Sequence, residues 1–303
     1  MSEKNKFDVV IIGGSYSGLS AALSLGRALR KVLVIDSGKP CNRVVEHSHN
    51  LLTHDGAKPK DITDLARQQL LVYENITFYN GFAETGIQTR NGFEITTTDG
   101  AIFTSRKIIF ATGLKDRLPN IEGFADCWGI SVLHCPYCHG YEYQGVATAI
   151  VGNGDAAFHY AQLIRNWTNK LTIFTNAAPE FTEVQWNKFN RYDIKVVSTE
   201  IARLDHENGQ VKNIILNGGS KMKVEAIYSK PETQQHSEIP FTLGCELNEQ
   251  GLLKVDAFQR TTVPGVYACG DNSNFARSLA VSVSSGSAAG AFLNNDLCAE
   301  DFA

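Results

Sequence analysis

The sequence predicts an α/β fold with two Rossmann-like nucleotide-binding units, and three observations lead to this prediction. A strand at residues 8–12, apolar after Asp8, runs into a glycine-rich turn and then a helix, which is the pattern of a dinucleotide-binding unit. A second copy of the pattern begins near residue 147. The chain of 303 residues is long enough for about two domains of ordinary size.

The first unit is a strand, a turn, a helix and a second strand. Residues 8–12 form the first strand, and after Asp8 they are an unbroken apolar run, which is typical of a strand covered on both faces. Apolar side chains then recur at helical spacing over residues 19–29. Residues 31–36 form the second strand, which ends in an acid.

The residues of the first turn have separate roles. Gly13 permits the tight bend, and Gly18 allows the helix to pack closely on the strand. Ser15 stands where the pattern has its middle glycine, and it is small enough for the site to persist. The helix N-terminus presents N–H groups to phosphates. Asp36 can accept hydrogen bonds from a ribose.

The second unit repeats this order and is followed by shorter strands. It predicts a strand at residues 147–151, a turn at 152–157, a helix at 158–167 and a strand at 171–175. The remaining predicted strands are residues 93–98 and 101–104 as a hairpin, 107–113, and 263–271. We expect one domain from residues 1–116 and 245–303, interrupted by an inserted domain at 117–244.

Composition excludes several classes of protein. The apolar fraction of 43% and the charged fraction of 20% are ordinary for a soluble globular protein. A net charge of −4 without a basic run argues against nucleic acid as a partner. No apolar stretch is long enough to span a membrane. The short polar lead at residues 1–6 leaves no room for a signal peptide, so we expect a cytoplasmic location.

Cys135 and Cys138 are the only close pair among seven cysteines. Their spacing is that of a redox dithiol at a helix N-terminus, where the helix dipole and nearby imidazoles favour a thiolate. His134 and His139 flank the pair, and either could handle the proton of thiol exchange. A dithiol of this kind can exchange two electrons with a flavin.

Other interpretations of the pair compete. The sequence Cys135-x-x-Cys138-His139 also matches a c-type haem attachment site, which needs export from the cytosol. A zinc site would need two more ligands at similar spacing, and no second pair exists, so we expect no metal. The two cysteines could also be buried residues without redox chemistry.

With its motifs in this order, the chain resembles the low-molecular-weight thioredoxin reductases, a branch of the FAD-dependent disulfide oxidoreductases. The resemblance implies FAD in the first domain, Cys138 facing the flavin, Cys135 exchanging with substrate, and a homodimer. The residues expected to bind FAD are Gly13, Gly14, Ser15, Gly18, Asp36, Arg43, Ala111, Gly270, Asp271, Leu279 and Ala280.

Four departures from that family matter. His139 replaces the aspartate that follows the second cysteine. No Lys or Arg lies between Leu171 and Asn187, where NADPH-dependent members hold the 2′-phosphate, which makes NAD(P)H doubtful. The segments at 227–231 and 277–280 also differ from the family pattern.

Residues 135–142 instead resemble the dithiol oxidases of gliotoxin and holomycin biosynthesis. That resemblance implies oxidation of a small-molecule dithiol, with oxygen as acceptor and no need for NADPH. One alternative is a reductase driven by NAD(P)H or a reduced electron-transfer protein, acting on a thioredoxin-like partner. Another is a flavin-bearing redox sensor without turnover.

Overall fold

The computed structural model describes residues 5–303 and divides them into two compact units. The first contains the segments up to Arg43, Asn50–Lys115 and Thr233–Ala303, and the second contains Val44–His49 and Asp116–Glu232. The boundaries after Lys115 and Glu232 fall in the paired strands β7 (Leu114–Arg117) and β16 (Glu232–Gln235). The division therefore lies at residue 232, where β16 begins, whereas the sequence predicts 244.

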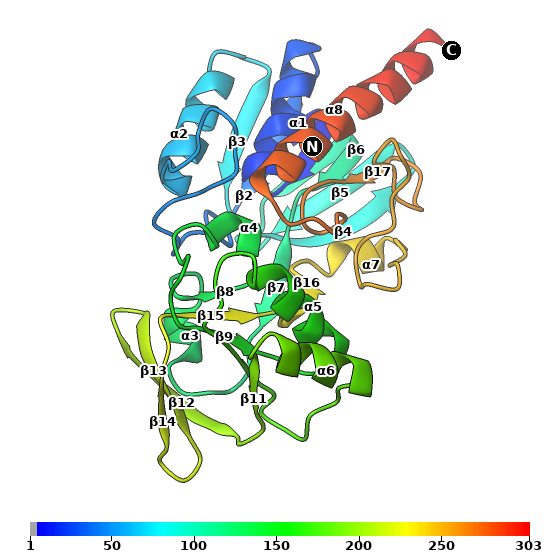
Figure 1. Cartoon of the computed structure of the whole chain (residues 1–303). Helices are drawn as coiled ribbons and strands as arrows, with labels where there is room; N and C mark the ends of the chain where they lie inside the picture. The colour runs from blue at the N-terminus through cyan, green and yellow to red at the C-terminus, as the bar shows by residue number, and fades with distance from the viewer. Residues whose placement is uncertain (1–4) are drawn as a thin grey trace. The chain divides into compact units, whose positions relative to one another are not determined.

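The first unit is a mostly parallel sheet in the order β3-β2-β1-β6-β5-β4, with β17 also paired to β6. Its strands are β1 (Lys6–Ile12), β2 (Val32–Asp36), β3 (Ile76–Asn80), β4 (Ala83–Thr89), β5 (Gly92–Thr97), β6 (Ile102–Phe110) and β17 (Val266–Ala268). Its helices are α1 (Tyr16–Arg27), α2 (Pro59–Leu70), α7 (Ile239–Thr242) and α8 (Leu279–Phe302). Helices α1 and α8 pack side by side (Figure 1).

Strand β1 is apolar from Val9 to Ile12 because each of its faces there belongs to a different core. Val10 and Ile12 pack into one buried cluster, whereas Val9 and Ile11 pack into the other with α1 and α8. All four side chains are buried. Burial of each contributes about 1.5–3 kcal/mol, which explains why the strand is unbroken in the sequence.

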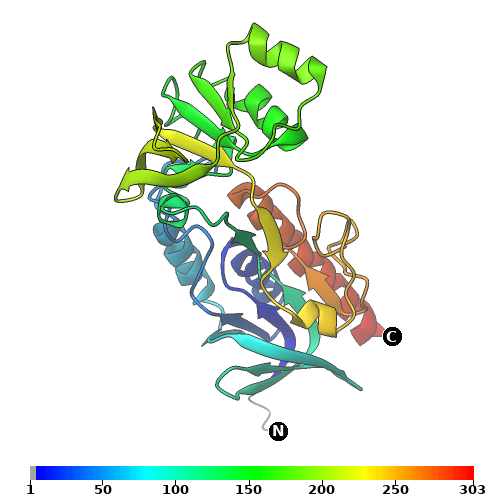
Figure 2. The ribbon, with the colours of Figure 1, turned by 90° about the horizontal axis from the view of Figure 1, so that it is seen from below.

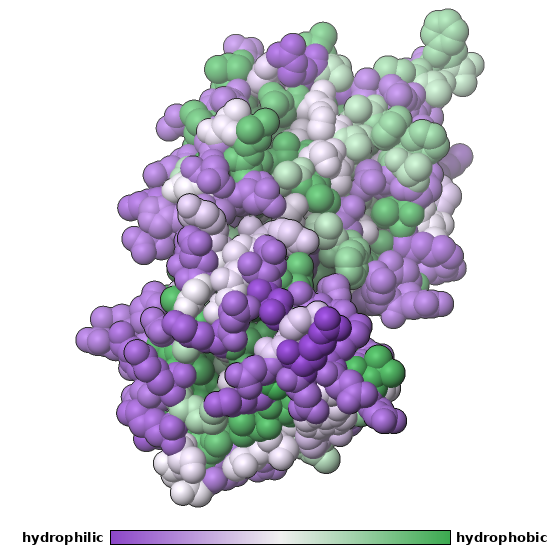
Figure 3. Space-filling view, viewed as in Figure 1, coloured by the Kyte–Doolittle hydropathy of each residue, from purple (hydrophilic) through white to green (hydrophobic). Residues whose placement is uncertain are grey.

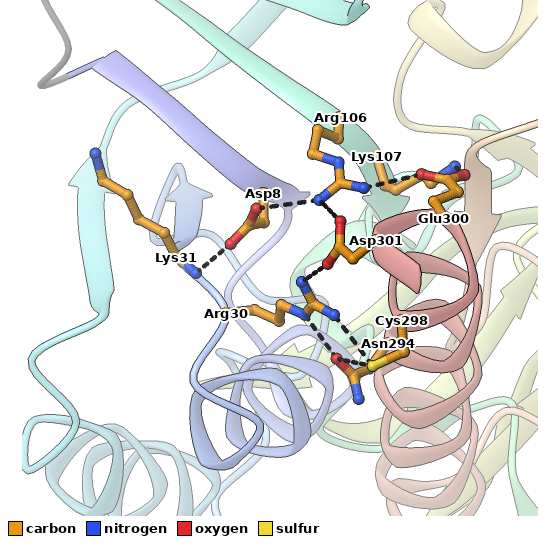
Figure 4. Close-up of polar contacts among 9 residues, drawn as sticks. All are labelled: Asp8, Arg30, Lys31, Arg106, Lys107, Asn294, Cys298, Glu300 and Asp301. Carbon is orange, nitrogen blue, oxygen red and sulfur yellow. Dashed lines mark hydrogen bonds and ion pairs between the residues drawn. The ribbon is translucent and has the colours of Figure 1, made fainter. Parts of the chain in front are cut away.

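Strand β6 corrects the predicted separation of residues 101–104 from 107–113. It runs continuously through residues 105–107. The basic side chains of Arg106 and Lys107 are accommodated because acids from α8 pair with them (Figure 4). Its first half pairs with β5 and its last residues pair with β17. Strands β5 and β17 therefore pair with different parts of the same edge of β6.

The second unit is a parallel sheet in the order β11-β10-β9-β15-β8, with a three-stranded antiparallel sheet beside it. Its strands are β8 (Val132–Leu133), β9 (Thr148–Val151), β10 (Leu171–Phe174), β11 (Lys195–Val197), β12 (Ile201–Glu207), β13 (Gln210–Leu216), β14 (Lys221–Lys223) and β15 (Ala226–Ser229). Its helices are α3 (Phe124–Cys127), α4 (Pro136–His139), α5 (Gly154–Ile164) and α6 (Glu183–Arg191).

Two cores cover the faces of the parallel sheet in the second unit. Strands β12 and β13 pack on one face and helices α5 and α6 on the other, as Figures 1 and 2 show. Helix α5 begins at Gly154, four residues before the predicted start at 158, so the glycine turn itself forms the helix N-terminus.

The surface in Figure 3 mixes polar and apolar side chains without a continuous apolar band. Near the end of α8, Phe302 is 96% exposed. Within residues 5–303, no helix has both the length and the apolar character needed to cross a membrane.

Candidate functional site

The predicted turn residues of the first unit lie together at the C-terminal end of β1. A Cβ added to Gly13, whose φ is +108°, would lie 2.2 Å from the Ala111 carbonyl oxygen. A Cβ on Gly18 would lie 1.8 Å from the Gly13 carbonyl oxygen, and one on Gly14 would lie 2.7 Å from Cβ of Asp36. Only glycine fits these three positions, so the turn is closely packed.

The N-terminal end of α1 fits the pyrophosphate of FAD. Ser15 is the N-cap residue, but its side chain makes no capping hydrogen bond. The first turn of α1 contains no acidic side chain. The helix dipole at this end is therefore available to a phosphate. Asp36 ends the adjacent strand and is half-buried.

The predicted residues after β17 also reach α1. A Cβ on Gly270 would lie 2.5 Å from Oγ of Ser17, and the Gly270 N–H donates to Oγ of Ser285 on α8. The carboxylate of Asp271 accepts a hydrogen bond from Nε of Arg277 at 3.2 Å. Asp271 is thus held at the N-terminal end of α8, where Leu279 and Ala280 begin the helix.

Arg43 and Asn272 have contrasting surroundings. Arg43 is exposed and donates to the Pro40 carbonyl oxygen within its own loop, so no hydrogen bond links it to the turn in the described residues. Asn272, which the sequence did not single out, is fully buried and leaves its Oδ1 without a partner. Its Nδ2 donates to the Phe110 carbonyl oxygen.

Cys135 and Cys138 form a disulfide at the start of α4. Cys135 is the N-cap residue, and its Sγ accepts a hydrogen bond from the Cys138 N–H at 3.1 Å. Helix α4 has only four residues, so its dipole is weaker than that of the longer helix that the Cys-x-x-Cys spacing predicts.

His134 and His139 have different surroundings. The ring of His134 stacks on Trp128, and its carbonyl oxygen accepts a hydrogen bond from Tyr160 at 2.6 Å. Burial lowers the pKa of His139, while the carboxylate of Glu142 raises it and His49 lowers it. His139 is therefore neutral at physiological pH and can accept a proton.

An aromatic pair supports the segment that contains the disulfide. Tyr137, between the two cysteines, is 65% exposed and packs edge-on against Trp167 at 5.8 Å. A Cβ on Gly140 would lie 2.7 Å from the Trp167 indole. Glycine at 140 thus lets the chain turn directly over the ring.

The second glycine turn is closed by its own chain. Oδ1 of Asn153 accepts hydrogen bonds from the N–H groups of Gly154 and Glu180, each at 2.9 Å. Nδ2 of Asn153 donates to the Ala178 carbonyl oxygen at 2.8 Å. The loop after β10 is thereby fastened to the N-terminus of α5, and the Glu180 carboxylate lies 3.8 Å from the Cβ position of Gly154.

This closure was not visible in the sequence. Asn153 and Glu180 are far apart in the chain, and neither belongs to a motif that predicts contact between them. The only sign of a changed nucleotide site in the sequence was the absence of basic residues after β10. In the structure, a carboxylate stands where the resemblance would place cationic side chains.

Comparison with known proteins places the chain in a family. The model of the pyridine nucleotide-disulphide oxidoreductases matches residues 7–288. The thioredoxin reductase aclD of Aspergillus oryzae is 32% identical, over 93% of this chain and 94% of its own length. The thioredoxin reductase sirT of Leptosphaeria maculans is 31% identical, over 98% and 96%.

Solved structures agree with this assignment. An oxidoreductase from Agrobacterium tumefaciens is 33% identical with a TM-score of 0.91, covering 97% of this chain and 99% of that one. The crystal structure of HlmI is 30% identical with a TM-score of 0.93, covering 100% and 96%. The predicted Rossmann-like fold, enzyme class and FAD cofactor are confirmed. The chain belongs to the pyridine nucleotide-disulphide oxidoreductase family and is an FAD-dependent oxidoreductase of the thioredoxin reductase-like type.

Proposed function

We propose that this enzyme oxidises a small-molecule dithiol to a disulfide through Cys135 and Cys138, independently of NADPH. The closed second turn is the observation that supports this most strongly. Asn153 already caps the N-terminus of α5, and Glu180 adds negative charge beside it. A nicotinamide dinucleotide would have to displace the loop and bring its phosphates toward that carboxylate, which is unfavourable.

The cysteines and His139 perform the thiol chemistry. A substrate thiol passes its proton to His139 as its sulfur bonds to Cys135, and the electron pair of the broken disulfide remains on Cys138 as a thiolate. The second substrate thiol then displaces Cys135, which closes the substrate disulfide and leaves two reduced cysteines. When bound, FAD would supply the two-electron acceptor for the reduced cysteines, with oxygen as the final acceptor and peroxide as its product.

The residues proposed to hold FAD are those of the first turn together with Gly270, Asp271 and the start of α8. The uncapped end of α1 would face the pyrophosphate, and Asp36 would accept hydrogen bonds from the ribose. His134, stacked on Trp128, is proposed as a second proton-handling group. A homodimer and a cytoplasmic location remain predictions.

A second candidate is a reductase that acts on a thioredoxin-like partner. The strand, turn and helix at β9 and α5 favour it, because they keep the form of a dinucleotide-binding unit. The names of the relatives also favour it, since aclD and sirT are described as thioredoxin reductases. A redox sensor would share the disulfide but would not turn over.

Steady-state turnover in air distinguishes these functions. We expect the enzyme to consume dithiothreitol and oxygen and to produce one peroxide per disulfide formed, with no acceleration by NADPH. Oxidation of NADPH coupled to reduction of a thioredoxin disulfide would contradict the proposal and support the reductase. A single stoichiometric reduction without further turnover would support the sensor.

A further inference from the structure

A segment from between β2 and α2 packs against the unit that contains the disulfide. This docked segment, Val44–His49, belongs to the second compact unit although the chain on either side belongs to the first. A methyl group of Val44 lies 2.8 Å from the Cβ position of Gly129, and Ser48 is buried. A side chain at residue 129 would therefore push the docked segment away.

The docked segment brings an imidazole to the carboxylate beside His139. Nε2 of His49 lies 3.5 Å from Oε1 of Glu142, and the two side chains are 21% and 37% exposed. Glu142 follows His139 by three residues, just after α4. Glu142 also lines a cavity of about 680 Å³ with Tyr143 and residues of β13 and β14.

We propose that Glu142 and His49 are positioning residues that set the pH at which His139 accepts the substrate's thiol proton. This inference deepens the proposed function and depends on His139 acting as a base there. The Glu142 carboxylate favours the protonated imidazole, and His49 offsets that charge when it is itself protonated. The two groups therefore act on the proton affinity of His139 in opposite directions.

The electrostatic directions around His139 agree with this arrangement. Burial lowers the pKa of His139, Glu142 raises it and His49 lowers it. The cavity beside Glu142 is also lined by Tyr143, Glu225 and the lysines of β13 and β14, Lys212, Lys221 and Lys223. Burial raises the pKa of both Tyr143 and Tyr228, so both stay neutral. Glu142 and His49 are the charged groups that act on the pKa of His139, so removing either should shift that pKa.

The test is the pH dependence of disulfide exchange in the full-length holoenzyme. Dithiothreitol is mixed anaerobically with the protein, and the free thiols of Cys135 and Cys138 are trapped with iodoacetamide and counted by mass spectrometry. The pH at which disulfide exchange reaches half of its maximal extent, the midpoint, should fall by about one unit in Glu142→Gln. It should rise in His49→Gln and stay close to wild type in Glu142→Asp.

Asp126→Asn is the matched control, because it removes a carboxylate from a similar pair with His206 at 3.6 Å, elsewhere in the unit. Its midpoint should not move. Equal midpoints in all variants, or shifts of Glu142→Gln and His49→Gln in the same direction, would overturn the inference. Flavin reduction by NADPH would defeat the proposed function but would leave this pH test unaffected.

Discussion

At the residue scale, the chemistry depends on which cysteine passes electrons onward. Cys135 is the N-cap residue of α4, and the Cys138 N–H donates to its Sγ, so the two sulfurs have different surroundings. His139 follows Cys138 directly, and burial keeps it neutral by lowering its pKa. The proposed roles therefore assign substrate exchange to Cys135 and flavin reduction to Cys138.

Cys138→Ser tests this assignment. Dithiol turnover should fall by roughly the 10⁴-fold or more that loss of a covalent catalytic group produces, because the mixed disulfide at Cys135 can no longer pass electrons onward. Cys298→Ser is the control, since Cys298 is an exposed free cysteine on α8. Steady-state peroxide production measures both variants, and turnover by Cys138→Ser would disprove the assigned role.

At the element scale, α1 and α8 pack closely because small residues line their contact. Ser20 on α1 donates to the Val283 carbonyl oxygen at 2.7 Å, and Ser24 donates to that of Ser287 at 3.3 Å. A Cβ on Gly286 would lie 2.1 Å from the Ser17 carbonyl oxygen. The N-terminal end of α1, proposed to face FAD, is thus held in place by α8.

Gly286→Ala should move α8 away from α1. We expect a loss of about 2–3 kcal/mol in the free energy of unfolding, because the methyl group meets backbone that cannot give way. The flavin should also dissociate more readily. Denaturant unfolding and the flavin content after gel filtration measure these effects. Ser284→Ala, on the exposed side of α8, is the control, and equal behaviour of the two variants would contradict the packing argument.

At the scale of the whole molecule, the end of the chain is tied back to its beginning. Asp301 pairs with Arg106 on β6 at 2.7 Å and with Arg30 after α1 at 2.6 Å, as Figure 4 shows. Arg106 also pairs with Asp8 on β1 at 3.8 Å. Hydrogen bonds from Arg30 and Arg106 lower the pKa of Asp301.

The sign of the resulting pH dependence follows from that lowered pKa. The stabilisation is present above the carboxylate's ordinary pKa and is lost as pH falls through the lower folded value. Asp301→Asn should therefore be less stable than wild type at neutral pH, and the difference should shrink below about pH 4. Thermal unfolding over a pH series measures this, with exposed Glu84→Gln as control. A difference independent of pH would contradict it.

The parts of the fold that could be predicted are those with local causes. Gly13 and Gly18 signal their turn because any side chain there would collide with nearby backbone. The apolar run of β1 follows from burial on both faces. The disulfide was predictable because its two cysteines are only three residues apart.

The parts that could not be predicted depend on distant residues. Arg106 and Lys107 interrupt the apolar pattern of β6, and only the acids of α8 make them compatible with a strand. The pairing of His49 with Glu142 has no local signal. The same holds for the link from Asn153 to Glu180, so the sequence showed only that cations were missing after β10.

Flavin reduction under anaerobic conditions tests the central claim most directly. The oxidised holoenzyme is mixed with dithiothreitol, NADPH or NADH in a stopped-flow spectrometer, and the loss of flavin absorbance is followed. Dithiothreitol should bleach the flavin completely, whereas neither nicotinamide should do so within the same time. Rapid bleaching by NADPH or NADH would contradict the account.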